Sequence, residues 1–378
     1  MVKIRISIVL FLLCFFAHNR ALCGVGESAV ITLVFPWGAA ENGMGEVGTA
    51  LADRENVGFY NPAGLGANNK RWHSGEIGQF YEPLLPAFNL PDLWHTSIAG
   101  CWQPQSQMFG GFSVWMNFLN FGINEWTDYY GRTLGAARAW EMVTGVSWGF
   151  SLAEFSLPNH NLGITTKLIW SELARGYGPN GEGTAQGFAI DAGYLYTAPF
   201  GLRLGLNVAN MGPSVFYISE QDSDPIPFTI NLALGFKREI IEQGLSIMRI
   251  RTEYRLEREF VKSYVDKNPE PFWKAISRDI ADDSFEDNMR EIIHHIGAEM
   301  TVFNIGSLRW GYMHDEAGRR REMHIGLGVT AYNHIDFDWY YILSKRRSPA
   351  RHGQWGISVR LHRLADWSSK DARWWMAD

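Results

Sequence analysis

Cysteines, prolines and long apolar runs are scarce in this chain, and each scarcity excludes a class of protein. The 378 residues include three cysteines and 15 prolines. Cys14 and Cys23 lie in an N-terminal leader, so we expect the exported chain to keep only Cys101 and to form no internal disulfide. A small secreted domain held together by disulfides is therefore excluded.

Membrane helices and basic clusters are also missing. Beyond the leader no run of eighteen uncharged apolar residues occurs, which excludes a helical membrane protein. The 34 Lys and Arg stand against 40 Asp and Glu, a net charge of −6, which argues against nucleic acid as a partner. What the chain has instead is 14% aromatic residues and 39 glycines, a combination that favours β structure.

Residues 1–23 have the features of a secretory signal peptide. Lys3 and Arg5 precede an unbroken apolar core from Ile6 to Ala17, which is too short to cross a bilayer as a helix. Ala21-Leu22-Cys23 offers a cleavage site before Gly24. Lipidation of Cys23 is the alternative, although Arg20 stands where a lipidation motif has an apolar residue. We expect an exported protein.

Apolar and polar residues alternate with period 2 from about residue 74 to 363, as in strands with one apolar and one polar face. Most of the alternating runs are long enough for a tilted membrane strand. We count fourteen: 74–81, 94–102, 108–118, 140–152, 161–173, 185–197, 200–210, 228–237, 245–256, 293–303, 306–314, 322–332, 334–341 and 353–363.

The connections between these runs alternate in length. Those after odd-numbered runs hold 12, 21, 11, 17, 36, 7 and 11 residues, and those after even-numbered runs hold 5, 8, 2, 7, 2 and 1. Outer-membrane barrels show this pattern, with long external loops and short periplasmic turns. We predict an all-β fold, an antiparallel transmembrane β-barrel of about 14 strands in the outer membrane of a diderm bacterium. A soluble β-sandwich is the alternative.

Two groups of side chains fit a barrel. Tyr and Trp near strand ends suit the interface with the lipid headgroups: Tyr81, Trp94, Trp102, Trp115, Trp140, Trp170, Trp310, Trp339 and Trp355. Charges of both signs on the polar faces are predicted to pair in a wet lumen: Arg203, Arg249, Arg251, Glu253, Arg255, Glu299 and Arg309.

The segments outside the barrel have distinct compositions. Residues 24–73 carry a glycine-rich motif that we interpret as a hatch tucked into the barrel, with Gly43, Met44 and Gly45 followed by Asn61, Pro62, Ala63 and Gly64. Residues 257–292 form a charged insert with an amphipathic helical centre, and 364–378 form a C-terminal tail. A candidate partner-binding face of the insert comprises Phe272, Trp273, Ile276, Ile280 and Phe285.

Catalytic motifs find little support. The GxGxxG match at 176–181 precedes a strand instead of a helix, so we interpret it as a loop. His294, His295, His314 and His324 lack the spacing of a metal motif, and we expect them to be structural or lumen-lining. No GxSxG is present. We predict no catalytic residue, no metal ligand, no cofactor and no enzymatic activity.

The hatch motif and several strand segments resemble the PorV/PorQ-type outer-membrane family, which is related to the FadL-type long-chain fatty acid transporters. In that family a Gly-Met-Gly segment precedes a small-residue helix and an Asn-Pro-Ala turn. The other segments that carry the resemblance are 122–128, 166–174, 189–196, 202–213 and 308–312, although the insert 257–292 is longer than the family pattern suggests.

This resemblance implies a component of type IX protein secretion that binds cargo or the translocon and passes cargo to the surface attachment machinery. Loops 119–139, 211–227 and 257–292 would then bind these protein partners, with outer-membrane lipid around the barrel. The alternative is a FadL-type transporter of fatty acids or other hydrophobic molecules, with lipid or detergent in the lumen. It predicts an apolar pocket near the hatch, lined by Phe59, Tyr60, Phe80 and Tyr81.

Overall fold

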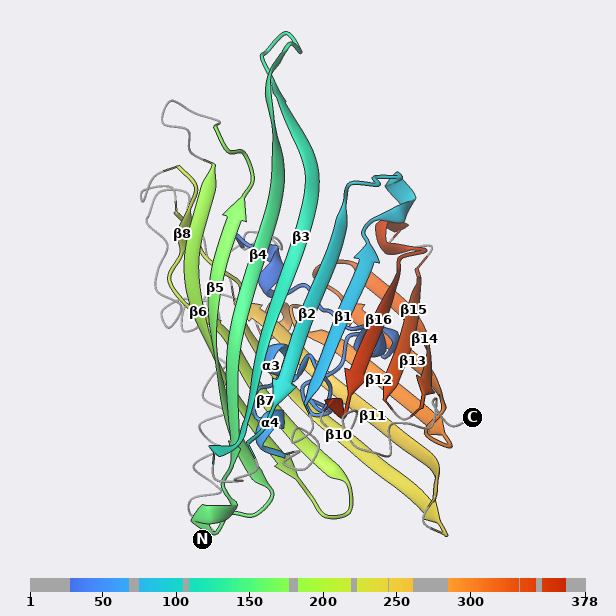
Figure 1. Cartoon of the computed structure of the whole chain (residues 1–378). Helices are drawn as coiled ribbons and strands as arrows, with labels where there is room; N and C mark the ends of the chain where they lie inside the picture. The colour runs from blue at the N-terminus through green and yellow to red at the C-terminus, as the bar shows by residue number, and fades with distance from the viewer. Residues whose placement is uncertain are drawn as a thin grey trace.

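A closed antiparallel β-barrel dominates the computed structural model (Figure 1), as the sequence predicts. The structure describes residues 28–67, 75–104, 109–176, 183–218, 223–243, 245–260, 285–332, 334–344 and 349–364. Within these ranges fourteen strands form the barrel: β1 (Glu76–Pro83), β2 (Trp94–Trp102), β3 (Gly111–Thr127), β4 (Thr133–Ser151), β5 (His160–Glu172), β6 (Thr184–Thr197), β7 (Leu202–Met211), β10 (Phe228–Glu242), β11 (Leu245–Phe260), β12 (Ile293–Val302), β13 (Gly306–Asp315), β14 (Arg320–Ala331), β15 (Ile335–Leu343) and β16 (Trp355–His362).

Each strand pairs with its neighbours along the barrel, and the last strand pairs with the first. Glu76 at the start of β1 lies opposite His362 at the end of β16, which closes the sheet. Closure removes the exposed strand edges that would otherwise leave unpaired amides in hydrocarbon. The shorter elements are β8 (Val215–Phe216), β9 (Ser223–Asp224), η3 (Pro86–Phe88), η5 (Ala153–Phe155), α6 (Phe285–Arg290) and η7 (Pro349–Arg351).

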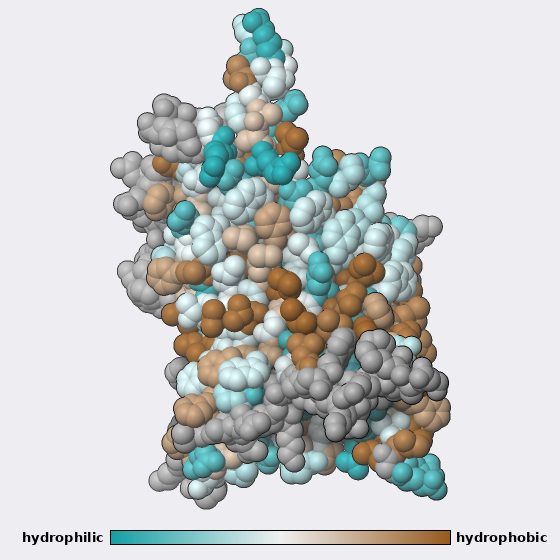
Figure 2. Space-filling model, viewed as in Figure 1, coloured by the Kyte–Doolittle hydropathy of each residue, from teal (hydrophilic) through white to brown (hydrophobic). Residues whose placement is uncertain are grey.

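The two faces of the wall follow the alternation in the sequence. On β14, Ile325 and Leu327 point outward and are exposed, whereas Glu322 and His324 point inward and are fully buried. Apolar residues gather in a band across the wall in Figure 2, while the tip of the β3–β4 hairpin is hydrophilic. An apolar outer band around a polar interior is the arrangement of a barrel embedded in the outer membrane. No helix in the described parts of the chain is long and apolar enough to cross a membrane.

The longest connections lie at one end of the barrel, as predicted. The prediction that residues 119–139 form a loop is wrong. β3 and β4 continue as a paired hairpin from Gly122 opposite Ala139 to Thr127 opposite Thr133. This hairpin rises above the other strands (Figure 1). Both of its faces are wet there, so the apolar alternation that marks a membrane strand disappears although the backbone pairing does not. Likewise β11 extends to Phe260, into the predicted insert.

The described part of the N-terminal segment, residues 28–67, lies inside the barrel (blue in Figure 1). It contains η1 (Ile31–Leu33), α2 (Ala39–Gly43), α3 (Val57–Tyr60) and α4 (Gly64–Ala67). We keep the name hatch for this segment. The signal peptide 1–23, the tail beyond Leu364 and the insert side chains Phe272, Trp273, Ile276 and Ile280 lie outside the described residues, as does the side chain of Phe285.

Glycines of the wall allow the hatch backbone to approach closely, which supports the sequence interpretation of the hatch. A Cβ atom on Gly311 of β13 would lie 2.0 Å from the backbone nitrogen of Gly45. A Cβ on Gly297 of β12 would lie 2.3 Å from the carbonyl oxygen of Met44. Backbone atoms cannot move aside as a flexible side chain can, so only glycine fits at these wall positions.

Aromatic side chains form an external cluster near the ends of four adjacent strands. Tyr81 contacts Trp94, Trp94 contacts Phe118, and Phe118 stacks on Trp140, with ring centroids 5.5 to 6.3 Å apart. This placement fits the predicted interfacial role. Trp115 is the exception, because it is buried in the lumen against Phe59, at a centroid distance of 5.7 Å.

Candidate functional site: the hatch and the cavity beside it

A single carboxylate on the wall fixes the glycine-rich part of the hatch. The oxygens of Glu253 accept hydrogen bonds from the backbone N–H groups of Gly48, Thr49, Ala50 and Leu51, at 2.7 to 3.1 Å. Hydrogen bonds to a charged acceptor are stronger than those between neutral groups. The four amides therefore bond the carboxylate and not the carbonyl groups of a helical turn. For this reason residues 44–53 are not the small-residue helix that the PorV/PorQ resemblance implies.

Asp53 of the hatch is the centre of the first charge cluster. Its carboxylate lies 2.5 Å from Arg251, 2.7 Å from Lys237 and 3.5 Å from Arg203. All four residues point into the lumen from different places in the chain. Three cations around one buried carboxylate compensate the cost of taking that charge out of water.

Arg54, the next residue, is the centre of the second cluster and carries the opposite charge. It lies 2.8 Å from Glu299 and 3.3 Å from Asp338. Arg309 pairs with the same two carboxylates, at 2.6 and 2.7 Å. Burial alone would lower the pKa of Arg54, but the carboxylates of Glu299, Asp338 and Glu41 hold its pKa well above the usual value.

The predicted lumen charges are therefore brought together, but largely through the hatch and less through one another. Arg203, Arg251, Glu253 and Glu299 contact the hatch, and Arg309 pairs with the Glu299 carboxylate that also binds Arg54 of the hatch. Arg255 pairs with Glu257 at 2.6 Å. Arg249 shares the ninth barrel strand, β11, with them, but no ion pair within 4 Å is seen for it in the described part of the chain.

The Asn-Pro-Ala turn of the hatch motif docks on the opposite side of the lumen. Asn61 donates hydrogen bonds to the carbonyl oxygens of Thr49 and Tyr194, at 2.9 and 3.1 Å, and its own side-chain oxygen accepts from the N–H of Ala63. Pro62 lies against Gly163 of β5, and Gly64 packs on Ala52. Asn61 thus joins the two halves of the hatch to the wall.

Two histidines hold the Gly43-Met44-Gly45 turn. Nδ1 of His295 lies 2.8 Å from the carbonyl oxygen of Gly45, and Nδ1 of His324 lies 2.8 Å from that of Asn42. Both side chains line the lumen, as predicted. His294 faces the outer surface and bonds the Tyr254 hydroxyl.

Burial and charge shift the pKa of two hatch carboxyls in opposite directions. Burial raises the pKa of Glu55 to about 7, and the nearby carboxylates of Glu41 and Glu76 add to the rise while Arg360 opposes it. Burial would also raise the pKa of Glu46, but Arg351, 2.8 Å away, outweighs it and holds that pKa well below the usual range. Cys101 is buried beneath this region, and its thiol donates to the carbonyl of Glu55.

A cavity of about 370 Å³ lies beside the hatch. One side is apolar, with Ile31, Val34 and Phe35 from the N-terminal segment and Leu84, Leu93 and Leu119 from the wall and its first long connection. The other side is charged and includes Glu46, Arg255, Glu257, Arg320 and Arg351. A second space of about 30 Å³, also lined by Val34, is large enough for a water molecule only.

The FadL-type alternative predicts four aromatic residues for such a pocket, and two are there. Phe59 and Tyr60 line the cavity. Phe80 is buried elsewhere, stacked on Tyr340, because it follows the inward phase of β1. Tyr81 follows the outward phase and is exposed on the wall, which corrects that part of the prediction.

Several residues of the site could not be predicted from the sequence. Asp53 and Arg54 lie between the two halves of the hatch motif, so a charged pair within a glycine-rich segment was the signal available. Glu46 and Arg351 carry no such signal, since they are 305 residues apart and meet only after closure of the barrel.

No family model matches this sequence, and no curated protein matches it. Solved structures do. The TodX monoaromatic hydrocarbon channel, as its deltaS2 mutant, is 10% identical over 86% of this chain and 96% of that chain, with a TM-score of 0.52. This match shows the fold, a closed β-barrel like that of TodX.

Two further solved structures match with lower scores. The toluene transporter TodX of Pseudomonas putida is 10% identical over 92% of this chain and 97% of its own, with a TM-score of 0.47. A FadL homologue of Pseudomonas aeruginosa is 9% identical over 87% and 99%, with a TM-score of 0.45. The closer PorV/PorQ resemblance stays a prediction, because none of these matches tests it.

Proposed function

We propose that this FadL-like barrel is an outer-membrane channel for hydrophobic small molecules and performs no catalysis. The observation that carries the proposal is the cavity beside the hatch, whose volume of about 370 Å³ lies in the range of small-molecule sites. Its apolar side is well suited to hydrocarbon, because transfer of apolar surface from water is favourable. The matched TodX structure is described as a monoaromatic hydrocarbon channel, which agrees with this chemistry.

The hatch sets how such a molecule would pass. The ion pairs of Asp53 and Arg54 and the four amides bound to Glu253 hold the hatch in the lumen. A ligand that enters from the end with the long connections would meet the cavity first and the hatch second. Binding in the cavity therefore precedes any movement of the hatch in the proposed sequence.

Filling the cavity tests the proposal. Val34 lines both spaces, so a Val34→Trp variant is expected to weaken binding of a hydrophobic fluorescent probe such as N-phenyl-1-naphthylamine at least tenfold. Val114→Trp is the matched control, because Val114 is 61% exposed on the outside of the barrel. Probe binding that is equal in both variants and the wild type would contradict the proposal.

A second candidate is the type IX secretion role implied by the PorV/PorQ resemblance. One observation favours it: the projecting β3–β4 hairpin presents Tyr129 and Tyr130 with 98% and 78% of their surface exposed. Exposed tyrosines are common anchors of protein interfaces. Serine at both positions, or deletion of 261–284 between β11 and α6, should weaken pull-down of a secreted cargo domain. If variants that still insert into the membrane pull down the cargo domain as well as the wild type does, these segments do not bind cargo.

A further inference from the structure

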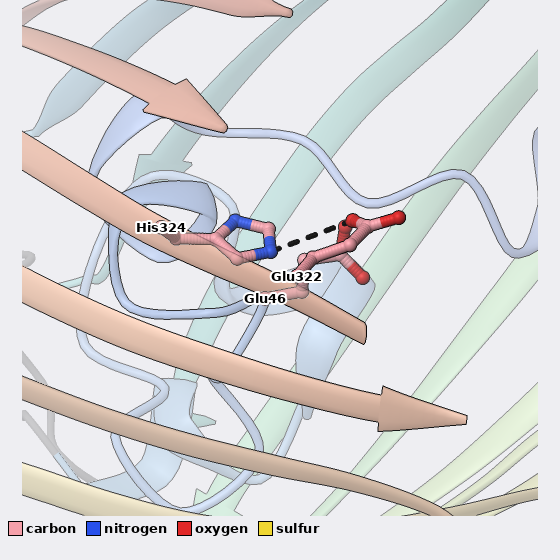
Figure 3. Close-up of side chains that lie close together, drawn as sticks. All are labelled: Glu46, Glu322 and His324. Atoms are coloured by element: carbon pink, nitrogen blue, oxygen red, sulfur yellow. Dashed lines mark ion pairs between the residues drawn. The ribbon is translucent and has the colours of Figure 1, made fainter. Parts of the chain in front are cut away.

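Three side chains that are far apart in the sequence meet where the hatch touches the wall (Figure 3). Glu46 comes from the hatch, and Glu322 and His324 come from the inward face of β14. One ligand atom from each lies within 4.8 Å of the other two, and all three residues are buried. None of them is part of the hydrophobic side of the cavity described above.

One ring nitrogen of His324 bonds the hatch, and the other faces the Glu322 carboxylate. Nδ1 lies 2.8 Å from the carbonyl oxygen of Asn42, which can only accept, so Nδ1 carries the hydrogen. Nε2 lies 3.6 Å from the Glu322 carboxylate, and Figure 3 marks this pair. In a neutral imidazole Nε2 carries a lone pair that a metal ion can accept. His324 is fully buried, and Nε2 has no hydrogen-bond partner in the described structure. Two acceptors facing each other in a buried site favour a cation between them.

We propose that Glu46, Glu322 and His324 form a binding site for a divalent transition-metal ion, with Zn²⁺ and Mn²⁺ as the best fits. One imidazole nitrogen and two carboxylates are donors that such ions accept. The Nδ1 hydrogen bond to a backbone carbonyl is the outer contact that commonly orients a metal-binding imidazole. Donors on a tetrahedral zinc lie about 3.3 Å apart, so closure from 4.8 Å needs small side-chain rotations only.

Arg351 competes for this site. Its guanidinium lies 2.8 Å from Glu46 and 2.9 Å from Glu322, so it bridges the two carboxylates that the metal would take. With a neutral His324, the carboxylates of Glu46 and Glu322 and the guanidinium of Arg351 together carry one net negative charge. Arg351 belongs to η7 in the long connection before β16, and its side chain is 14% exposed. Arg351 and the metal are therefore alternative occupants.

The cavity supplies a route for the ion. Glu46 and Arg351 both line it, so an ion that enters the cavity reaches the carboxylates by displacing the guanidinium. Because Glu46 belongs to the hatch and the other two ligands to the wall, the bound ion would tie the hatch to β14. This inference is independent of the proposed hydrocarbon passage.

Calorimetric titration of the full-length protein in detergent tests the site, with ZnCl₂ or MnCl₂ added after treatment with EDTA. The wild type is expected to bind one ion per chain. His324→Gln should weaken binding roughly 100-fold, while its amide still donates to Asn42. His295→Gln is the matched control, because His295 makes the same kind of bond to the hatch but lies outside the triad, and its affinity should stay within about twofold.

Arg351→Gln gives a gain that a purely structural ion-pair cluster would not show. Removal of the competing charge should tighten metal binding roughly tenfold. Heat-dependent migration on electrophoresis confirms that each variant is a folded barrel. No binding of either ion by the wild type and Arg351→Gln would overturn the proposal, as would binding that His324→Gln leaves unchanged.

Discussion

Asp53, Arg54 and Glu55 are consecutive residues of the hatch with three different electrostatic roles. Asp53 gathers cations of the wall and Arg54 gathers carboxylates. Glu55 is buried near Arg360 and two other carboxylates, and its pKa is raised to about 7. Two of the three hold the hatch by charge, and the third makes its docking depend on pH.

The pH dependence has a definite sign. In the docked hatch Glu55 holds its proton more tightly than in a released hatch, where its pKa has the ordinary value of 4.5. The contribution of Glu55 to hatch docking is therefore fully present below pH 4.5 and is lost as the pH rises through about 7. Hydrogen exchange of the hatch amides, corrected for the intrinsic effect of pH, should show decreasing protection across that window.

The variant Glu55→Gln should lose most of this dependence, because an amide does not titrate. Glu41, whose pKa burial also raises, accounts for the part that stays. Glu125→Gln, on the exposed β3–β4 hairpin, is the control and should behave as the wild type. A Glu55→Gln profile that overlays the wild-type profile would show that another group controls docking.

At the scale of elements, the hatch fits the wall because glycines on the wall leave room for its backbone. Gly311 of β13 is the tightest of these positions, with backbone atoms of Met44 and Gly45 within 2.6 Å of its ideal Cβ. The β13 strand also offers a position without this constraint, since a Cβ on Gly306 meets nothing within 4 Å. Gly311 and Gly306 therefore provide a test position and a matched control position on the same strand.

Gly311→Ala should displace the hatch turn while the barrel still forms, at a cost of about 1–3 kcal/mol in hatch docking. We expect faster hydrogen exchange around Gly45 and a higher conductance in planar bilayers. Gly306→Ala should match the wild type in both. Wild-type exchange and conductance in Gly311→Ala would mean that the hatch does not depend on this contact.

The strands could be predicted well because lipid and lumen impose opposite polarities on alternate residues. Ile325 and His324 show the rule within one strand. The prediction was wrong where that contrast ends, as in the β3–β4 hairpin above the membrane. The hatch contacts were beyond reach, since Glu253 meets Gly48 and its neighbours across about 200 residues and no local pattern encodes such a meeting.

At the scale of the whole molecule, the lumen is occupied by a hatch that is tied to the wall from several sides. Clusters centred on Asp53 and Arg54, the amides on Glu253 and the turn at Asn61 all contribute. An open, water-filled pore is therefore not the resting state of the described structure. In the proposed function, a hydrophobic molecule binds in the cavity of about 370 Å³ before the hatch moves.

Uptake of radiolabelled toluene by cells that carry the protein in their outer membrane tests the central claim most directly. The wild type is expected to raise the initial rate several-fold above cells without it. Val34→Trp should return the rate to the background, and Val114→Trp should preserve it. If the wild-type barrel is present in the outer membrane and uptake stays at the background rate, the channel function is contradicted.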